Sequence, residues 1–326
     1  MTAPLIVTGA AGFVGARVVE AANRRGLPVV SVDSSDVFDE RPEHEGLDFG
    51  KIVDREELLA WLGSDRPELA GIVHLGACTD TTELDEDYLR RVNLEYSQGL
   101  WNHCTREGLT LVYASSAATY GDGTQGYSDD EDRMSELKPL NPYGQSKLDF
   151  DIWALDQERA GAAPPAWSGF KFFNVYGFGE RHKGRMASVV LQAFDQIHDR
   201  GGVRLFKSHH PDYEDGGQMR DFVYVRDVVD VLFFALETPL KRGIYNLGTG
   251  RARTFADLVR ATFASMGRPV DIEFVPTPED IRERYQYFTQ ADMGRLVNAG
   301  YDRPFTSLED GVADYVERLS SARGEG

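Results

Sequence analysis

The segment from Leu5 to Asp33 constrains the fold most, because it reads in succession as strand, glycine-rich turn, helix, strand and acid. The apolar run Leu5-Ile-Val7 leads directly into Thr8-Gly-Ala-Ala-Gly-Phe-Val-Gly15, and a second apolar run over 28–32 closes on Asp33. Glycines let a backbone approach a pyrophosphate at a helix N-terminus, and a carboxylate after the second strand suits two ribose hydroxyls. The segment therefore predicts a dinucleotide-binding unit.

The same alternation of strand and helix continues along the chain. Residues 54–62 and 88–107 read as helices, and 71–77 and 109–114 as buried strands. This alternation predicts an α/β fold: a Rossmann-type, doubly wound parallel sheet that binds ligands at the carboxyl ends of its strands. The expected cofactor contacts are the residues at those strand ends and in the glycine turn: Gly9, Ala11, Gly12, Phe13, Val14, Gly15, Asp33, Ser34, Leu75, Gly76, Ala77 and Cys78.

Composition excludes several classes of function. The formal net charge of -18 argues against a nucleic-acid surface, which requires a basic face. The two cysteines give no disulfide framework and favour a reducing cytoplasm. No apolar run is long enough to span a membrane, and the first residues lack the basic region of a signal peptide. We expect a cytoplasmic enzyme without a membrane or nucleic-acid partner.

A possible acid–base set lies in the middle of the chain. Tyr143 and Lys147 are four residues apart in a helix that begins at or just after Pro142, so they share one face. A neighbouring ammonium, and the charge of an oxidised nicotinamide, would favour tyrosinate. The hydroxyl of Ser116, just past a central strand, could bond the substrate oxygen. Together these three residues predict alcohol and ketone redox chemistry.

The second half of the chain has a different organisation. Expected elements are helices at 187–200, 228–237, 255–266 and 308–319 and strands at 203–206, 222–225 and 270–275. We expect residues 1–177 to form the dinucleotide-binding domain, with 222–249 returning to it. Residues 178–221 and 250–326 would form a smaller C-terminal α/β substrate lobe, with the substrate cleft between the lobes. The His- and acid-rich loop 207–218 reads as a solvated loop, and no metal is expected.

Several motifs resemble a known family. The chain is similar to the extended short-chain dehydrogenase/reductase enzymes that act on nucleotide-sugars, the NAD-dependent epimerase/dehydratase family. The resemblance rests on the glycine turn, the serine pair and the Tyr-x-x-x-Lys motif. It also rests on segments spread in order over nearly the whole chain: 74–78, 113–121, 139–147, 172–177, 182–189, 220–223, 245–252 and 285–292.

The resemblance implies a specific reaction. It is strongest to the branch that inverts C6″ of an ADP-activated glycero-manno-heptose. The hydroxyl is oxidised to a ketone by a tightly bound nicotinamide, and the hydride then returns to the opposite face, so no cofactor is consumed. Tyr143 would serve one face and Lys183 the other. Arg181 and a protonated His182 would favour the neutral, basic form of Lys183. A homo-oligomer, in the family a pentamer, is also implied.

The resemblance assigns further contacts residue by residue. Asn93, Val175 and Lys183 would contact the cofactor, as would Tyr143 and Lys147. Arg220 would pair with the diphosphate, for which a guanidinium fork is well shaped. The remaining substrate contacts would be Ser116, Asn174, Arg185, Gln192, Phe206, Ser208 and Tyr285. From the residues alone, Arg220 and Asp221 could equally form a surface ion pair.

Two departures from the family pattern concern specificity. Gln192 stands where some relatives have histidine. Residues 33–40 are acidic where family members place lysines that would neutralise the 2′-phosphate of NADP. These acids favour NAD, although the family uses NADP, and Arg41 or Lys51 could restore NADP binding; the effect of Arg17 is open.

Other functions stay open at this point. A nucleotide-sugar 4-epimerase or dehydrogenase of the same family needs only one tyrosine base, which would leave Lys183 idle. A dehydratase needs an acid pair after Ser116, where this chain has Ala117 and Ala118. A catalytically silent, cofactor-sensing protein would have no need of Ser116, Tyr143 and Lys147 together. His74, inside an apolar strand, reads as a packed histidine.

Overall fold

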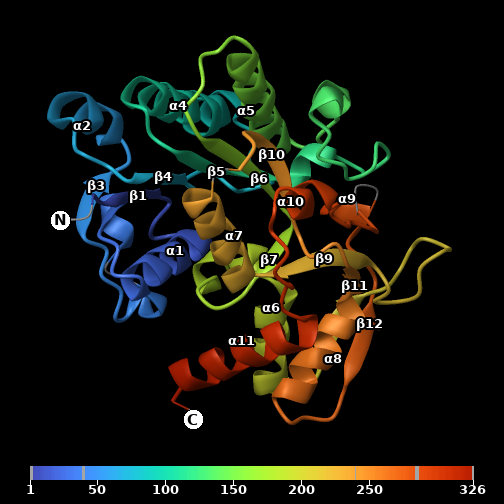
Figure 1. The fold of residues 1–326 in the computed structure, drawn as a ribbon. Coiled ribbons are helices and arrows are strands. Elements are labelled where there is room, and N and C mark those ends of the chain that lie inside the picture. Colours follow the sequence, from blue (N-terminus) through green and yellow to red (C-terminus); the bar gives the residue numbers. More distant parts are fainter. Residues whose placement is uncertain (1–2, 39–40, 239, 283–285, 325–326) are drawn as a thin grey trace. The chain divides into compact units, whose positions relative to one another are not determined.

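The structure is a computed structural model that describes residues 3–38, 41–238, 240–282 and 286–324. The chain divides into two compact units (Figure 1). The first comprises Met1–Phe172, Val229–Asn246 and Gly294–Tyr301, and the second comprises Phe173–Val228, Leu247–Met293 and Asp302–Gly326.

The first unit is built on a seven-stranded sheet in the order β10-β6-β5-β4-β1-β2-β3. All neighbouring pairs from β3 to β6 are parallel, as the sequence predicts. The strand order reverses direction at β1 and β4, the point at which doubly wound sheets bind nucleotides. The strands are β1 (Leu5–Thr8), β2 (Val29–Asp33), β3 (Lys51–Asp54), β4 (Gly71–His74), β5 (Leu111–Ser116), β6 (Trp167–Phe172) and β10 (Gly243–Leu247).

Helices cover both faces of this sheet; Figure 1 shows α4 and α5 above the strands and α1 and α7 below them. Trp101 on α4, Phe150 on α5 and Trp167 on β6 pack edge to face in the core, where apolar burial stabilises the fold. The helices are α1 (Phe13–Arg24), α2 (Leu58–Asp65), α3 (Glu86–Leu89), α4 (Tyr96–Glu107), α5 (Pro142–Arg159), most of α7 (Val225–Glu237) and α10 (Gly294–Asn298).

The second unit has two small sheets. One has the order β11-β9-β7, and the other pairs β12 with β8. Helix α8 packs against α6 and α11, and a capping box between Thr254 and Asp257 fixes its start. The elements are β7 (Asn174–Tyr176), α6 (Val189–Arg200), β8 (Val203–Phe206), β9 (Met219–Tyr224), β11 (Ala252–Thr254), α8 (Phe255–Ser265), β12 (Ile272–Val275), α9 (Glu279–Arg282) and α11 (Leu308–Ala322).

The fold class is confirmed, and the local differences have physical causes. The expected helix at 54–62 starts later, because Lys51–Asp54 pairs with β2 as an edge strand too short to show an alternating pattern. The expected helix at 88–107 contains a π-helical segment at Arg90–Glu95. The units also break at Phe172 rather than 177, and β9 lies in the second unit. The assignment of nucleotide to one unit and sugar to the other stays a prediction.

Within the described residues, no helix is long and apolar enough to cross a membrane.

Candidate functional site

The glycine turn is shaped by close backbone contacts. Gly9 has φ +67°, and a Cβ there would lie 2.8 Å from the backbone nitrogen of Gly76. A Cβ on Gly15 would lie 1.9 Å from the carbonyl oxygen of Gly9. These positions accept only glycine, because a side chain would collide with backbone atoms that cannot move aside. Gly12 is the residue before the first turn of α1. The ends of β1 and β4 therefore meet at the turn in close backbone contact, with no side chain at Gly9, Gly12 or Gly76 to keep a pyrophosphate from the backbone.

Asp33 lies beside this turn at the end of β2. Its carboxylate accepts hydrogen bonds from the backbone N–H groups of Ala11 at 3.1 Å and Ser34 at 3.0 Å. Burial raises the pKa of Asp33, and these two bonds, with Arg41 and Arg55, act against the rise. Of the other predicted cofactor contacts, Ala11 and Phe13 are buried, while Val14 and residues 75–78 are partly exposed. The structure thus brings the predicted residues of the turn and both strand ends together.

A buried hydrogen-bond chain runs from the turn through His74. Thr8 Oγ1 accepts from the N–H groups of Leu75 and Gly76, so its own hydroxyl must donate to His74 Nδ1, at 2.7 Å. Nε2 of His74 therefore carries the proton and donates to Ser97 Oγ at 2.8 Å. Burial, with a smaller effect of Lys147, lowers the pKa of His74 to about 3. The histidine is neutral and structural, as the sequence predicts.

Asn93 extends this chain toward α5. Ser97 Oγ donates to the Asn93 carbonyl oxygen, inside the π-helical segment. The Asn93 amide accepts from Cys78 N at 2.8 Å and donates to Cys78 O at 3.0 Å and Ser146 Oγ at 3.0 Å. Ser146 in turn donates to the carbonyl oxygen of Tyr143 at 2.8 Å. The side chain of Asn93 thereby links the loop after β4 to the first turn of α5.

Tyr143, Lys147 and Ser116, hereafter the acid–base centre, lie in the first unit. Helix α5 starts at Pro142 with Asn141 as its N-cap, so Tyr143 and Lys147 stand one turn apart as predicted. Burial raises the pKa of Tyr143. Ser116 opposes this rise, whereas Cys78 and Asp151 add to it, and the pKa stays above its ordinary value. The sequence predicts that Lys147 lowers the pKa of Tyr143. In the structure the pKa is raised instead, because desolvation is the largest effect.

Lys147 is itself perturbed. Its side chain is almost fully buried, and desolvation lowers its pKa to about 8. Asp151, one turn further along α5, acts against this, while Lys171 adds to it. Lys147 therefore titrates close to neutral pH, which is useful for a group that passes protons.

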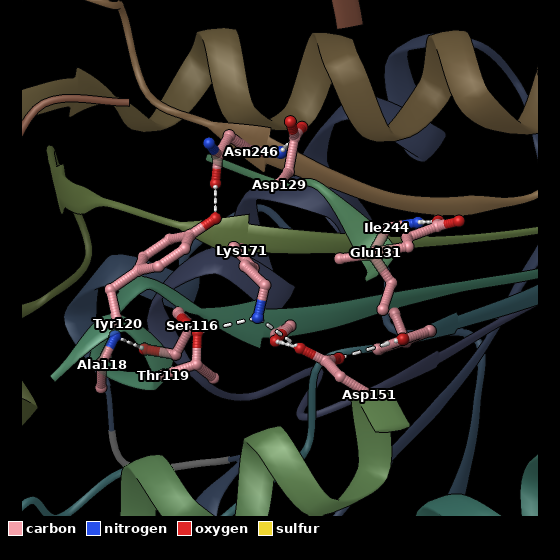
Figure 2. A network of polar contacts seen from close by, with 12 residues as sticks. Ser116, Ala118, Thr119, Tyr120, Asp129, Glu131, Asp151, Lys171, Ile244 and Asn246 are labelled. Atoms are coloured by element: carbon pink, nitrogen blue, oxygen red, sulfur yellow. Dashed lines mark hydrogen bonds and ion pairs between the residues drawn. The ribbon is translucent and has the colours of Figure 1, made fainter. Parts of the chain in front are cut away.

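A buried ion pair next to this centre was not predicted from the sequence (Figure 2). Lys171 Nζ on β6 lies 2.7 Å from Asp151 Oδ2 on α5, and both side chains are fully buried. Asp151 also accepts hydrogen bonds from Ser115 Oγ at 2.6 Å and the Tyr113 hydroxyl at 3.1 Å. Neither charged residue belongs to a family motif used above. Asp151, however, is four residues after Lys147, a spacing that could have revealed it.

Lys183 lies in the second unit, in a 3-10 segment at Arg181–Met186. Its Nζ is 3.6 Å from Oε2 of Glu180, whose fully buried carboxylate accepts from the backbone N–H of Ser188 at 2.8 Å and from the Ser188 hydroxyl at 2.5 Å. Arg181, expected to act on Lys183, pairs with Asp195 at 2.9 Å. The ion pair that the structure gives Lys183 is thus with a carboxylate, and Glu180 was missed by sequence reasoning.

Gln192 lies on α6 in the second unit. Its amide donates to the carbonyl oxygens of Arg185 at 3.2 Å and Ala187 at 3.0 Å. Gln192, which stands where some relatives have histidine, therefore supports the backbone around the exposed Arg185.

Arg220 and Asp221, adjacent on β9, are not a surface ion pair, because both are buried. Asp221 accepts hydrogen bonds from the N–H groups of Thr249, Gly250 and Ala291. Arg220 donates to the carbonyl oxygens of Met219 and Gln286.

The other predicted substrate and cofactor contacts of the second unit are less closely grouped. Asn174 and Val175 lie on β7 and pair in register with Phe222 and Val223 of β9. Phe206 ends β8 with 36% of its surface exposed, and Ser208 follows it. Ser208 N donates to Asp215 Oδ1 at 2.9 Å, which orders the loop. Tyr285 lies outside the described residues.

In the part of the chain that the structure describes, no three His, Cys, Asp or Glu side chains gather as metal ligands would.

The perturbed lysine leads to a stability prediction. Lys147 has a pKa of about 8 in the folded protein against an ordinary value of 10.5. Below pH 8 the folded state carries a buried proton at a cost on the order of 3 kcal/mol, and this cost disappears as the pH rises from about 8 to 10.5.

We therefore expect Lys147→Met to be more stable than the wild type at pH 7 in urea denaturation, with a difference that shrinks between pH 8 and 10.5. An exposed-lysine variant, Lys241→Met, should show no such trend. A stability difference for Lys147→Met that does not change with pH would contradict the account.

Comparison with known proteins places this geometry in a family. Residues 5–248 match the model of the NAD dependent epimerase/dehydratase family. The chain is 46% identical over 320 residues to the ADP-L-glycero-D-manno-heptose-6-epimerase of Nitratidesulfovibrio vulgaris strain Hildenborough, covering 97% of this chain and 98% of the relative. It is 43% identical to the Fusobacterium nucleatum enzyme of the same name, covering 96% and 97%. The crystal structure of the Helicobacter pylori ADP-L-glycero-D-manno-heptose-6-epimerase superposes with a TM-score of 0.83 at 26% identity, covering 98% of this chain and 97% of that one. The chain belongs to the NAD dependent epimerase/dehydratase family.

Proposed function

We propose that this protein is an isomerase that inverts C6″ of ADP-glycero-manno-heptose by transient oxidation to a ketone. The observation that carries the proposal is the placement of Tyr143 and Lys147 one turn apart on α5, with Ser116 acting to lower the pKa of Tyr143, within a dinucleotide-binding unit. The similarity to two epimerases of this name over nearly the whole chain supports the choice of substrate. A ketone intermediate explains how a carbon without an acidic proton can change configuration.

The reaction has two balanced halves. In the first, C6″ gives up a hydride, which a bound nicotinamide would accept, the hydroxyl proton passes to a protein base, and a ketone forms. In the second, the hydride returns to the opposite face of C6″ and a proton returns to the oxygen. A bound nicotinamide would supply both the hydride acceptor and the hydride donor, so the protein would need no external oxidant or reductant.

Tyr143 is the proposed acid–base group for one face of the carbon. Because burial raises its pKa, the phenol is neutral in the protein's own field, which suits it to donate a proton to the ketone oxygen. The hydrogen bond with Ser116 lowers the tyrosine pKa and so assists the reverse step. Lys147, with a pKa of about 8, can exchange a proton with its surroundings at neutral pH.

Lys183 is the proposed acid–base group for the opposite face of the carbon. Two observations support this role for Lys183. Its segment resembles that of the family, and its ammonium pairs with the buried Glu180 carboxylate, which helps to hold it in place as a catalytic group requires. Arg220 is proposed to bind the diphosphate, with Asn174, Arg185, Gln192, Phe206, Ser208 and Tyr285 as further substrate contacts.

For the cofactor we propose NAD rather than NADP. The Asp33 carboxylate, oriented by the backbone of Ala11 and Ser34, suits the two ribose hydroxyls and would repel a 2′-phosphate. The next acid, Asp36, adds negative charge. Arg41, which donates to the Ala11 carbonyl oxygen, is the residue that could offset this charge.

We also infer that the protein works as a homo-oligomer in the cytoplasm. The inference of an oligomer rests on the family resemblance, which implies a pentamer. The cytoplasmic location rests on the two cysteines, both of which are free thiols.

The activity is tested by proton NMR of the purified protein with ADP-D-glycero-D-manno-heptose and no added cofactor. We expect the L-glycero epimer to appear, and a loss of about a thousandfold in kcat for Tyr143→Phe and for Lys183→Met, the usual scale for a removed acid–base group. Tyr88→Phe and Lys241→Met are the matched controls and should retain activity.

No conversion by a folded, cofactor-loaded protein would withdraw the heptose assignment. UDP-, GDP- and dTDP-hexoses would then be tested, and 4-epimerisation insensitive to Lys183→Met would favour the single-base alternative.

The cofactor is tested by identifying the dinucleotide that the protein releases on denaturation. We expect mass spectrometry to find NAD. Asp33→Asn should weaken NAD binding at least about tenfold, since a hydrogen bond to a charged group is worth about 1.5–3 kcal/mol. Asp65→Asn, on the distant helix α2, is the control. Release of NADP would instead assign Arg41 to its 2′-phosphate.

A further inference from the structure

Among the described residues of the first unit, the ion pair between Asp151 and Lys171 is the most deeply buried one, and the proposed chemistry does not use it. In Figure 2 the Lys171 ammonium lies between Asp151 and Thr119, with Nζ 2.7 Å from Oδ2 and 2.8 Å from Oγ1. The Tyr120 ring also lies near the ammonium, with 5.3 Å between Lys171 Nζ and the ring centroid. Ser115 supplies a further hydrogen bond to Asp151. The charged groups are thus fully satisfied.

Fold stability alone gives no reason for this pair. Moving two charges out of water is costly, and an apolar pair of similar volume serves the stability of a core as well or better. A buried pair that is completely hydrogen-bonded instead fixes the geometry of whatever it touches. The elements that it touches are those that carry the acid–base centre.

The first connection leads to Ser116. Thr119 accepts from Lys171 and donates its own hydroxyl to the carbonyl oxygen of Ser116 at 2.8 Å. Ser116 begins the 3-10 turn Ala117–Tyr120, and its hydroxyl accepts from Ala118 N at 3.1 Å. Lys171 therefore holds the main chain of Ser116, the residue whose side chain lowers the pKa of Tyr143.

The second connection leads to Lys147. Tyr143, Lys147 and Asp151 follow one another at intervals of four along α5, on one face of the helix. The carboxylate of Asp151 favours the charged form of Lys147, and the ammonium of Lys171 disfavours it. His74, whose pKa Lys147 helps to lower, is neutral, and Tyr143 stands one turn before Lys147 on α5. Lys171 thus limits the influence of Asp151 on the pKa of Lys147.

We propose that Lys171 is a positioning residue for the acid–base centre. Through Thr119 it fixes the turn that presents Ser116, and through Asp151 it sets the charge beside Lys147. The consequence for catalysis rests on the proposed function, whereas the effect on Lys147 does not.

The two connections are separated by two variants of the cofactor-loaded protein. Thr119→Val removes the link to Ser116 and one hydrogen bond of Lys171, but keeps the ion pair between Lys171 and Asp151. We expect kcat to fall between about tenfold and a hundredfold, on the scale of a catalytic group displaced by about 1 Å, with KM within about twofold and the Lys147 titration unchanged. Thr262→Val, another fully buried threonine that donates to a backbone carbonyl, is the matched control and should keep the wild-type kcat.

The variant Asp151→Leu with Lys171→Met removes both charges together, because Lys171→Met alone would leave a buried carboxylate unpaired and could fail to fold. The Ser115 and Tyr113 hydroxyls lose their acceptor in this variant, so we expect its urea midpoint to fall while the protein stays folded without urea. The Lys147 pKa should fall, since Asp151 is the stronger of the two influences, and kcat should fall with it. The titration is read from lysine 13Cε NMR, which is tractable because the chain has only seven lysines.

A wild-type kcat in Thr119→Val, or an unchanged Lys147 titration in the double variant, overturns the proposal. If the wild type does not convert ADP-heptose, the proposed function fails by itself. The Lys147 titration, which needs no substrate, then still decides the positioning role.

Discussion

The close approach of backbone at Gly9 is the constraint on which the first unit depends. Because Gly9, Gly15 and Gly76 lack side chains, the ends of β1 and β4 meet where the sheet reverses direction. From the same place Thr8 begins the hydrogen-bond chain through His74 and Ser97 to Asn93. The nucleotide turn and the start of α5 are therefore parts of one connected structure, and the neutral state of His74 is what allows it to accept at one nitrogen and donate at the other.

Desolvation dominates the electrostatics of the acid–base centre. Burial raises the pKa of Tyr143 and lowers that of Lys147, so both groups are biased toward their neutral forms. A lysine with a pKa of about 8 can both give up and take back a proton near neutral pH, which suits an enzyme that must return every proton it takes. The positive charge of an oxidised nicotinamide, when bound, would favour tyrosinate during the oxidative half. The ion pair of Asp151 and Lys171 places opposite charges side by side, which limits the field that either imposes on Lys147.

Much of this could be predicted from the sequence, for physical reasons. The glycine turn, the parallel sheet and the helix beginning at Pro142 all depend on local backbone requirements that few residues meet. The pairing of Asp151 with Lys171, on α5 and β6, could not be predicted, since it depends on which strand lies beside the helix. Edge strand β3 was missed because its four residues owe their conformation to β2. The partner of Lys183 was missed because burial of Glu180 is a tertiary property.

The central claim is that C6″ changes configuration by losing and regaining the same hydride. The most direct test uses ADP-heptose deuterated at C6″ in ordinary water, with mass spectrometry and NMR of the epimer formed. The account predicts that the product keeps its deuterium at C6″, because the bound nicotinamide returns what it took. Replacement of that deuterium by hydrogen from the solvent would contradict the account and would require a mechanism of deprotonation and reprotonation at carbon.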